Sequence, residues 1–279
     1  MAKVGIIGGS GLYNIEGIEI TDEASLMTPY GQPSANFVTG NLNGAEVVFL
    51  PRHGKGHSLS PSEVNYRANI FGMKKLGVEA IVSVSACGSL KENIRPLDFV
   101  VPDQYFDRTY KRETSFCTKG LVGHAAMAEP YAPEIRNILV NCAKDLGLRV
   151  HDKGTYLNME GPQFSTKAES LVYRLWGMDI IGMTNATEAK LAREVEISYA
   201  TLAAVTDYDC WHDSHDSVTV EMIIQNLTKN VENAKDILKQ AIPQIAGIEK
   251  FSARGAMATA IVTAKELIPE NKLKELGLD

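Results

Sequence analysis

Short apolar runs alternate with longer stretches of helical periodicity along this chain of 279 residues, and this alternation is the strongest constraint on its fold. The short runs are rich in β-branched residues and end near Gly, Pro or Asp, which is typical of buried strands. They are Lys3–Ile7, Glu46–Leu50, Ala80–Ser85, Phe99–Pro102 and Thr201–Thr206. The longer stretches repeat apolar residues near the 3.6-residue period of a helix, at 61–76, 133–146, 165–176 and 218–242. This pattern predicts an α/β fold.

The length of the chain allows one large domain or two small ones. No repeat, low-complexity run or linker divides it, so we predict a single domain over residues 1–279. Helices are expected to begin at Ser60-Pro61 and at Ser165, because Ser is a common N-cap and Pro suits the first helical position. From about residue 255 we expect a C-terminal helical segment that docks late or on a neighbouring subunit.

The charge balance argues against nucleic acid and membrane partners. The formal net charge is -6, and no run of Lys or Arg offers the basic stripe that binding to nucleic acid requires. The apolar stretch near the N-terminus is only a few residues long, too short for a signal peptide or a membrane span. We therefore expect a cytoplasmic protein.

Cysteines and histidines do not form a metal-binding pattern. The cysteines, Cys87, Cys117, Cys142 and Cys210, are far apart and include no C-x-x-C pair, so reduced thiols are expected. His53 and His57 are spaced i, i+4, but they lie in a Gly-rich stretch where a helix is unfavourable. The sequence predicts no metal site.

A glycine-rich loop, Gly8-Gly9-Ser10-Gly11, directly follows the first predicted strand. Glycines let backbone N–H groups approach an anion, and the Ser10 hydroxyl can add a donor. The loop fits neither the G-x-G-x-x-G dinucleotide fingerprint nor the G-x-x-x-x-G-K-[ST] phosphate loop. Taken alone, it fits a plain tight turn equally well.

Two more strand ends carry groups suited to an anion. Arg52 and His53 follow the second predicted strand, and Ser85-Ala86-Cys87-Gly88-Ser89 ends the third. Separately, each segment is open to a simpler interpretation, a surface Arg with a solvated His or a tight exit turn. Because α/β sheets bind ligands at the carboxyl ends of their strands, the coincidence of all three predicts one shared anion site.

Asp207 and Asp209 follow the last apolar strand at i, i+2. In an extended chain that spacing places both carboxylates on the same side. Two neighbouring acids raise one another's pKa, which allows a carboxyl group to donate a proton near neutral pH. A harmless surface pair of acids has the same spacing.

Seven motifs in order carry a family resemblance: GGSGLY (8–13), PRHGKGHSLSPSEVNYRANI (51–70), SACGSL (85–90), MAEPY (127–131), EGPQFSTKAES (160–170), GMTNATE (182–188) and TDYDCW (206–211). Together they resemble the methylthioadenosine phosphorylase branch of the purine nucleoside phosphorylases, over roughly residues 4–246. The resemblance implies a central mixed sheet flanked by helices and a homotrimer, or a dimer of trimers, with active sites near subunit boundaries. It implies phosphorolysis of S-methyl-5'-thioadenosine in purine and methionine salvage, with phosphate as co-substrate and no metal or organic cofactor.

The resemblance also implies a role for each matching residue. Phosphate would be held by Ser10, Arg52, His53, Ser85, Ala86 and Thr184. Met183 would lie under the ribose, and Phe164 and Ser165 would line the purine pocket. Asp207, as the catalytic acid, and Asp209 would face N7 and the 6-amino group of the base. Val220 and Ile223 would border the 5' group, and His124 would come from a neighbouring subunit.

Two positions depart from the family pattern. Asn185-Ala186-Thr187 replaces the usual Thr-Val-Pro, and Ser85 stands where Thr is common. The first change lies beside the expected phosphate and ribose site, so it bears on substrate preference. The alternatives to be weighed are a 6-oxopurine nucleoside or methylthioinosine phosphorylase, a non-catalytic nucleoside-binding module and, less well supported by the motifs, a dinucleotide-dependent reductase.

Overall fold

The computed structural model describes residues 1–13, 15–212 and 220–278, with backbone alone for Ser10, Tyr13 and residues 220–224. Its strands are β1 (Lys3–Gly8), β2 (Ile18–Ala24), β3 (Phe37–Leu42), β4 (Ala45–Pro51), β5 (Val78–Ser89), β6 (Phe99–Val100), β7 (Gln104–Asp107), β8 (Val150–His151), β9 (Thr155–Asn158), β10 (Ile180–Gly182) and β11 (Ser198–Asp207). Its α-helices are α1 (Tyr66–Lys75), α2 (Pro133–Asp145), α3 (Lys167–Leu175), α4 (Asn185–Glu194), α5 (Val220–Ala246) and α6 (Lys272–Leu276), and two 3₁₀ turns lie at η1 (Ser10–Tyr13) and η2 (Lys265–Leu267).

The strands form one mixed sheet, which confirms the predicted fold class. Its main path runs β2-β3-β4-β1-β5-β10-β9-β7. A branch leaves this path at β5: β11 pairs with β5 and β6, and β6 pairs with β8. The pairs β4-β1, β1-β5 and β5-β11 are parallel, whereas β10 joins β5 antiparallel. β5 is therefore the central strand, and the carboxyl ends of four strands meet at one edge.

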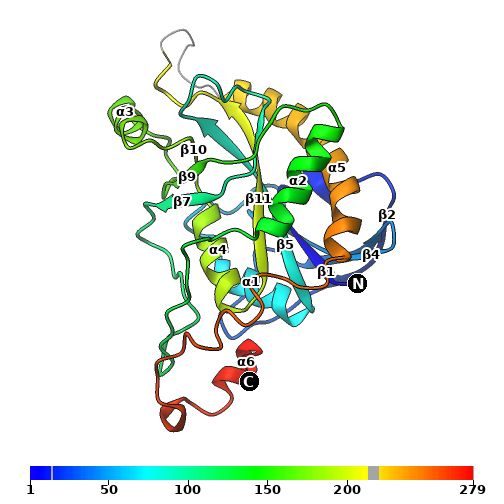
Figure 1. The fold of residues 1–279 in the computed structure, drawn as a ribbon, viewed down its shortest axis with the longest axis vertical. Coiled ribbons are helices and arrows are strands. Elements are labelled where there is room, and N and C mark those ends of the chain that lie inside the picture. The colour runs from blue at the N-terminus through cyan, green and yellow to red at the C-terminus, as the bar shows by residue number, and fades with distance from the viewer. Residues whose placement is uncertain (14, 213–219, 279) are drawn as a thin grey trace.

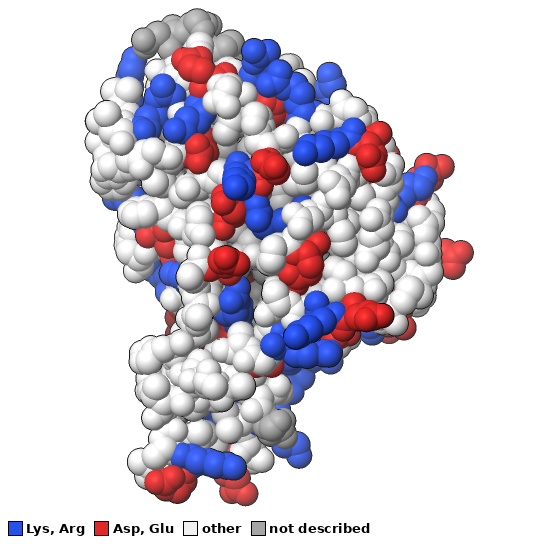
Figure 2. Space-filling model, in the orientation of Figure 1, with Lys and Arg blue, Asp and Glu red and all other residues white. Residues whose placement is uncertain are grey.

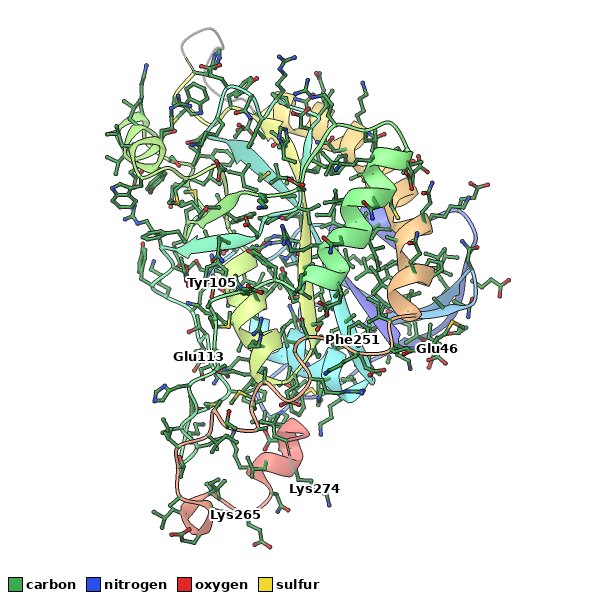
Figure 3. The ribbon with its side chains drawn as sticks, viewed as in Figure 1. Glu46, Tyr105, Glu113, Phe251, Lys265 and Lys274 are labelled. Atoms are coloured by element: carbon green, nitrogen blue, oxygen red, sulfur yellow. The ribbon has the colours of Figure 1, made fainter. Side chains whose placement is uncertain are left out.

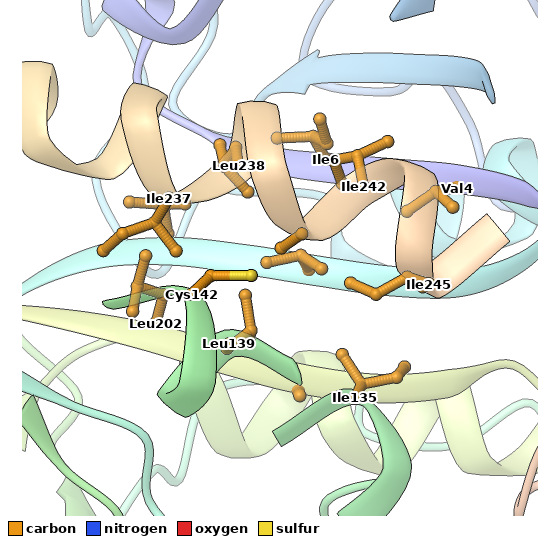
Figure 4. Packing of buried hydrophobic residues seen from close by; sticks show 14 of the residues in the cluster. Val4, Ile6, Ile135, Leu139, Cys142, Leu202, Ile237, Leu238, Ile242 and Ile245 are labelled. Carbon is orange, nitrogen blue, oxygen red and sulfur yellow. The ribbon is translucent and has the colours of Figure 1, made fainter. Parts of the chain in front are cut away.

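Helices cover both faces of this sheet (Figure 1). On one face α2 and α5 lie side by side, and Figure 4 shows Leu139 and Cys142 of α2 packed with Ile237 of α5 beside Leu202 of β11. On the other face α1 and α4 bury a second apolar cluster that includes Ile70 and Leu191. Burial of these large side chains on both faces is the main stabilising contribution.

Two predicted helix starts are wrong. α1 begins at Tyr66 because the Asn65 side chain caps it by accepting a hydrogen bond from the Ala68 N–H, whereas the preceding Ser60–Val64 segment forms a turn. α3 begins after Thr166, which forms a capping box with Glu169, one residue beyond the predicted Ser165.

The C-terminal part is mostly turns rather than the predicted helical segment, with only η2 and α6 as helical elements. Leu276 of α6 is fully buried in the cluster beneath α1, so this end docks on its own chain. Figure 1 shows the segment extending away from the sheet before α6 returns.

The described residues include no helix that is both long and apolar enough to cross a membrane. On the face drawn in Figure 2, basic and acidic side chains are interspersed rather than gathered into a basic stripe.

Candidate active site

The sheet brings three of the predicted anion-binding segments to one edge. Gly8, at the end of β1, pairs with Pro51 at the end of β4, and the Arg52 N–H donates to the Gly8 carbonyl at 2.9 Å. The neighbouring strand β5 runs parallel to β1, with Ile7 opposite Ser83. The glycine loop, Arg52-His53 and Ser85-Ala86 therefore meet as predicted.

Arg52 is not a surface residue, because only 3% of it is exposed. Its Nε donates to Glu188 Oε1 at 2.5 Å, and its Nη2 donates to Glu188 Oε2 at 3.1 Å and to Ser83 Oγ at 2.6 Å. Nη1 donates to the Val84 carbonyl at 3.2 Å, which leaves its second N–H for a ligand. Arg52 can therefore contribute one donor to an anion while it remains bound to Glu188.

Glu188 belongs to the first turn of α4, and the protein holds it from several sides. Besides Arg52, its Oε2 accepts from Tyr199 Oη at 2.7 Å and from Ser83 Oγ at 3.1 Å. Burial opposes the charged form of Arg52, but the contact with Glu188 outweighs it and raises the pKa of the guanidinium. The pair links the end of β4 to β5, β11 and α4.

His53 has a defined tautomer. Its Nδ1 lies 2.9 Å from the Leu59 carbonyl oxygen, which can only accept, so Nδ1 carries a hydrogen. Burial, with the nearby charge of Arg52, lowers the pKa of His53 to about 4. The ring is neutral at pH 7 and its Nε2 is a hydrogen-bond acceptor. His57 stacks on it with ring centroids 4.2 Å apart.

The remaining predicted phosphate residues lie around this edge. The Ser85 hydroxyl is buried beside Tyr156, and neither hydroxyl has a partner of good hydrogen-bond geometry. Ala86 is exposed although it lies within the central strand. Thr184 is the N-cap of α4, yet its hydroxyl does not cap the helix. The side chain of Ser10 lies outside the described part of the chain, so its predicted role stays a prediction.

Asp207 and Asp209 come together, but not through the extended geometry we expected. Asp207 ends β11, and the chain then turns, with Asp209 in a left-handed conformation at φ 50°. Oδ1 of Asp207 accepts the Asp209 N–H at 2.8 Å, which closes this turn, and its Oδ2 accepts from Thr206 Oγ1 at 2.6 Å. The i, i+2 argument is therefore wrong, because the chain leaves the strand conformation after Asp207.

Both acids have raised pKa values. Burial raises the pKa of Asp207, partly offset by its bonds to Thr206 and to the Asp209 N–H. Burial, together with the charge of Asp207, raises the pKa of Asp209 to about 6. The pair can therefore hold a proton close to neutral pH.

The predicted purine residues lie beside the acids. The Cys210 thiol donates to the Ser165 carbonyl at 3.2 Å, and the Ser165 hydroxyl helps to stabilise the Asp209 anion. Phe164 is 55% exposed and so is open to contact with a ligand or a subunit. Met183 directly precedes Thr184. A Cβ added to Gly161 would lie 2.6 Å from the Sδ atom of Met183, so these two residues are close together.

The three residues that depart from the family pattern, Asn185-Ala186-Thr187, pack into the interior of the protein. Asn185 accepts a hydrogen bond from the buried Tyr131 hydroxyl, Ala186 is fully buried, and Thr187 Oγ1 lies 3.4 Å from Arg112 Nη1. The departure from the family pattern therefore lies in residues that pack at the start of α4.

One predicted residue, His124, is not brought to this edge by the described chain. His124 is exposed on a segment that pairs with the C-terminal part, its N–H donating to the Ala260 carbonyl at 2.9 Å. The side chains of Val220 and Ile223 lie outside the described residues. Among the residues that are described, no group of His, Cys, Asp and Glu could hold a metal ion.

Sequence reasoning missed Glu188, Glu160 and Arg112 as members of the site. Glu188 and Glu160 lie within quoted motifs, but their partners are distant in sequence: 136 residues separate Arg52 from Glu188. One feature of the sequence could have indicated Glu188: Arg52 follows a buried strand, and a buried Arg requires a negatively charged partner.

Removing one member of the Arg52–Glu188 pair should destabilise the protein strongly. We expect Glu188→Ala to lower the free energy of unfolding by about 3–5 kcal/mol, because it leaves Arg52 charged and buried without a partner. Denaturant unfolding of Glu188→Ala, Arg52→Ala and the double variant measures this. The double variant should lose clearly less than the sum of the single losses.

The control for that cycle is Glu46→Ala, which breaks an exposed pair with Lys3. It should leave the unfolding midpoint nearly unchanged. Strict additivity of the two buried substitutions would show that Arg52 and Glu188 do not stabilise one another.

Comparison with known proteins shows which family the chain resembles along most of its length. A family model described as the phosphorylase superfamily matches residues 3–243. The S-methyl-5'-thioadenosine phosphorylase of Koribacter versatilis is 50% identical, with 99% of this chain and 95% of that protein covered. Its counterpart in Thermosynechococcus vestitus is 51% identical, with 99% and 97% covered.

Solved structures agree with the sequence relatives. A methylthioadenosine phosphorylase from an antarctic soil metagenomic library superimposes with a TM-score of 0.94 at 49% identity, covering 99% of this chain and 98% of that one. The Schistosoma mansoni methylthioadenosine phosphorylase in complex with adenine gives 0.88 at 36% identity, covering 96% and 100%.

Proposed function

Because the chain belongs to the phosphorylase superfamily, we propose that it cleaves S-methyl-5'-thioadenosine with phosphate, giving adenine and S-methyl-5-thio-α-D-ribose 1-phosphate. The observation that carries the proposal is the Asp207–Asp209 pair, which lies beside Ser165 and ends a strand parallel to β5, the strand that carries Ser85 and Ala86. Relatives at 50–51% identity are named for this reaction.

In the proposed reaction a phosphate oxygen forms a bond to C1' of the sugar as the C1'–N9 bond breaks. The electron pair of that bond goes to the purine, and Asp207 delivers a proton to N7. Bound phosphate stabilises the positive charge that develops on the sugar, so the contribution of the protein is largely electrostatic. No step requires a metal or an organic cofactor.

The tautomer of His53 determines how phosphate would bind. Because Nδ1–H is occupied by the Leu59 carbonyl, a ligand of the neutral ring has to donate to Nε2. Hydrogen phosphate has one P–OH group that can do so, while its remaining oxygens accept from Arg52 and the hydroxyls.

We predict that His53→Asn raises the KM for phosphate by about tenfold or more, the effect of losing one hydrogen bond to a charged ligand. The KM for the nucleoside should change much less. His53→Gln, whose amide oxygen can replace Nε2 as acceptor, should lose less than His53→Asn. Steady-state kinetics with each substrate varied measures both values.

His57→Ala is the matched control, since it removes the stacked ring but not the acceptor. Equal phosphate constants for wild type and His53→Asn would remove His53 from the phosphate site.

The acid pair favours a 6-amino purine. A carboxylate only accepts hydrogen bonds, as a 6-amino group requires, whereas a 6-oxo group needs a donor. With its pKa near 6, Asp209 loses its proton and becomes the better acceptor as the pH rises above that value.

We therefore predict that kcat/KM for methylthioadenosine rises between pH 5 and pH 7 as Asp209 ionises. In Asp209→Asn the group at this position cannot titrate, although its amide oxygen still accepts. The ratio of wild-type to variant kcat/KM should rise through about pH 6, because ionisation of the substrates is common to both. A ratio that stays constant with pH would contradict the role of Asp209.

A direct assay tests the function itself. Incubation with methylthioadenosine should release adenine only when phosphate is present, and methylthioinosine and inosine should react more slowly. Adenine binding without turnover would indicate the non-catalytic alternative, and faster release of hypoxanthine would indicate a 6-oxopurine enzyme.

Exposed apolar side chains support the proposed trimer. Leu175 and Trp176 at the end of α3 are 85% and 51% exposed, and Trp176 contacts Phe106 of β7, which is also exposed. Such a contiguous apolar surface is typical of a subunit interface. We propose that the protein is a trimer in the cytoplasm, which sedimentation equilibrium and cell fractionation test. We also assign His124 to the site of a neighbouring subunit; mixing His124→Ala with Arg52→Ala subunits should then restore activity in hybrid oligomers.

A further inference from the structure

Arg112 is a buried guanidinium for which the proposed reaction has no use. Its side chain is only 2% exposed, although it lies on an irregular segment after the edge strand β7. Figure 3 labels Tyr105 on β7 and Glu113 next to Arg112, so the course of this segment along the side of the sheet can be followed. A buried Arg outside regular structure has to be held by specific partners.

The partners of Arg112 include two backbone carbonyls from different walls of the site. We call residues 160–165 the purine wall, and Met183 and Thr184 the ribose floor. Nη2 donates to the Glu160 carbonyl at 2.7 Å, and Nη1 donates to the Met183 carbonyl at 2.5 Å. Glu160 begins the segment that leads to Phe164 and Ser165, and Met183 precedes Thr184. One planar group therefore joins the purine wall to the ribose floor.

Side-chain contacts fix the orientation of the guanidinium. Its Nε donates to Glu160 Oε1 at 3.2 Å, and Nη1 lies 3.1 Å from the Tyr66 hydroxyl and 3.4 Å from Thr187 Oγ1. Arg112 also stacks over the Tyr66 ring, at 5.1 Å from its centroid. The fork shape of Arg allows these contacts at once, which Lys cannot reproduce.

Glu160 is held just as firmly. Its carboxylate accepts from the Ser62 hydroxyl and from the N–H groups of Tyr110 and Lys111, at 2.8 and 3.3 Å for the latter two. Burial would raise the pKa of Glu160, but these hydrogen bonds and Arg112 together lower it. The carboxylate is therefore charged and ties the Arg112 segment to the one that follows the His53 loop.

The two walls lie close together at Gly161. A Cβ added to Gly161 would lie 2.6 Å from Met183 Sδ, so the glycine backbone packs directly against the Met183 side chain. Any shift of one wall changes the gap in which a nucleoside would lie, and small displacements of this kind have large effects on reactivity.

We propose that Arg112 is a positioning residue that sets the spacing between the purine wall and the ribose floor, and thereby the affinity for the nucleoside. The proposal rests on the proposed function for the identity of that ligand. The contacts of Arg112 given above do not include Arg52, His53 or Ser85, and Arg112 reaches the phosphate half only through the start of α4, so affinity for the nucleoside should depend on it more than affinity for phosphate.

Arg112→Lys tests this, because it keeps the charge beside Glu160 but loses the fork. We expect the KM for methylthioadenosine and the dissociation constant of adenine, measured by calorimetry, to rise about tenfold or more. The KM for phosphate should rise clearly less than either of these two constants. The matched control is Arg136→Lys, since Arg136 also binds backbone carbonyls, those of Pro102 and Asp152, but on α2 away from the site.

A second pair of variants serves if Arg112→Lys does not fold. Tyr66→Phe and Thr187→Val leave Arg112 in place but remove contacts that orient it, and each should weaken nucleoside binding more than phosphate binding. Equal changes in both constants, or constants that match those of Arg136→Lys, would show that Arg112 only stabilises the fold and would overturn the proposal. Absence of adenine release by the wild type would instead refute the proposed function, while the adenine dissociation constants would still test Arg112.

Discussion

The buried ion pair between Arg52 and Glu188 is the interaction on which the rest of the site depends. It joins the end of β4 to the first turn of α4, and Ser83 and Tyr199 tie it to β5 and β11. Four elements that are distant in sequence are thereby fixed at one edge of the sheet. Because the pair is buried, the arrangement depends on the hydrogen bonds that join Arg52 and Glu188 to each other and to Ser83 and Tyr199.

A second ion pair, between Arg112 and Glu160, holds the other half of the site. The start of α4 connects the two, because Glu188 binds Arg52 while Met183 and Thr187 contact Arg112. Phosphate and nucleoside would therefore lie between two rigid networks that share one helix terminus. The acids at 207 and 209 lie at the end of β11, and the same strand carries Tyr199.

Sequence patterns predicted the parts of this structure that depend on local chemistry. The long apolar strands and the meeting of their carboxyl ends were predicted correctly, because burial on both faces leaves a continuous β-branched run. The predicted start of α1 at Ser60-Pro61 was wrong, because residues 60–64 form a hydrogen-bonded turn and Asn65 is the residue that caps the helix. Strands such as β8 and β10, of two and three residues, are too short to show a period. The partners of Arg52 and Arg112 were beyond reach, because only the folded chain brings them together.

The central claim is that the Arg52–Glu188 pair presents a preformed phosphate site at the strand ends. A crystal structure of the protein soaked with phosphate tests it most directly. The account predicts a phosphate within hydrogen-bond distance of the remaining Nη1 hydrogen of Arg52, with its P–OH directed at His53 Nε2, and with Arg52 still bound to Glu188. A phosphate bound elsewhere, or an Arg52 side chain released from Glu188 to reach it, would contradict the account.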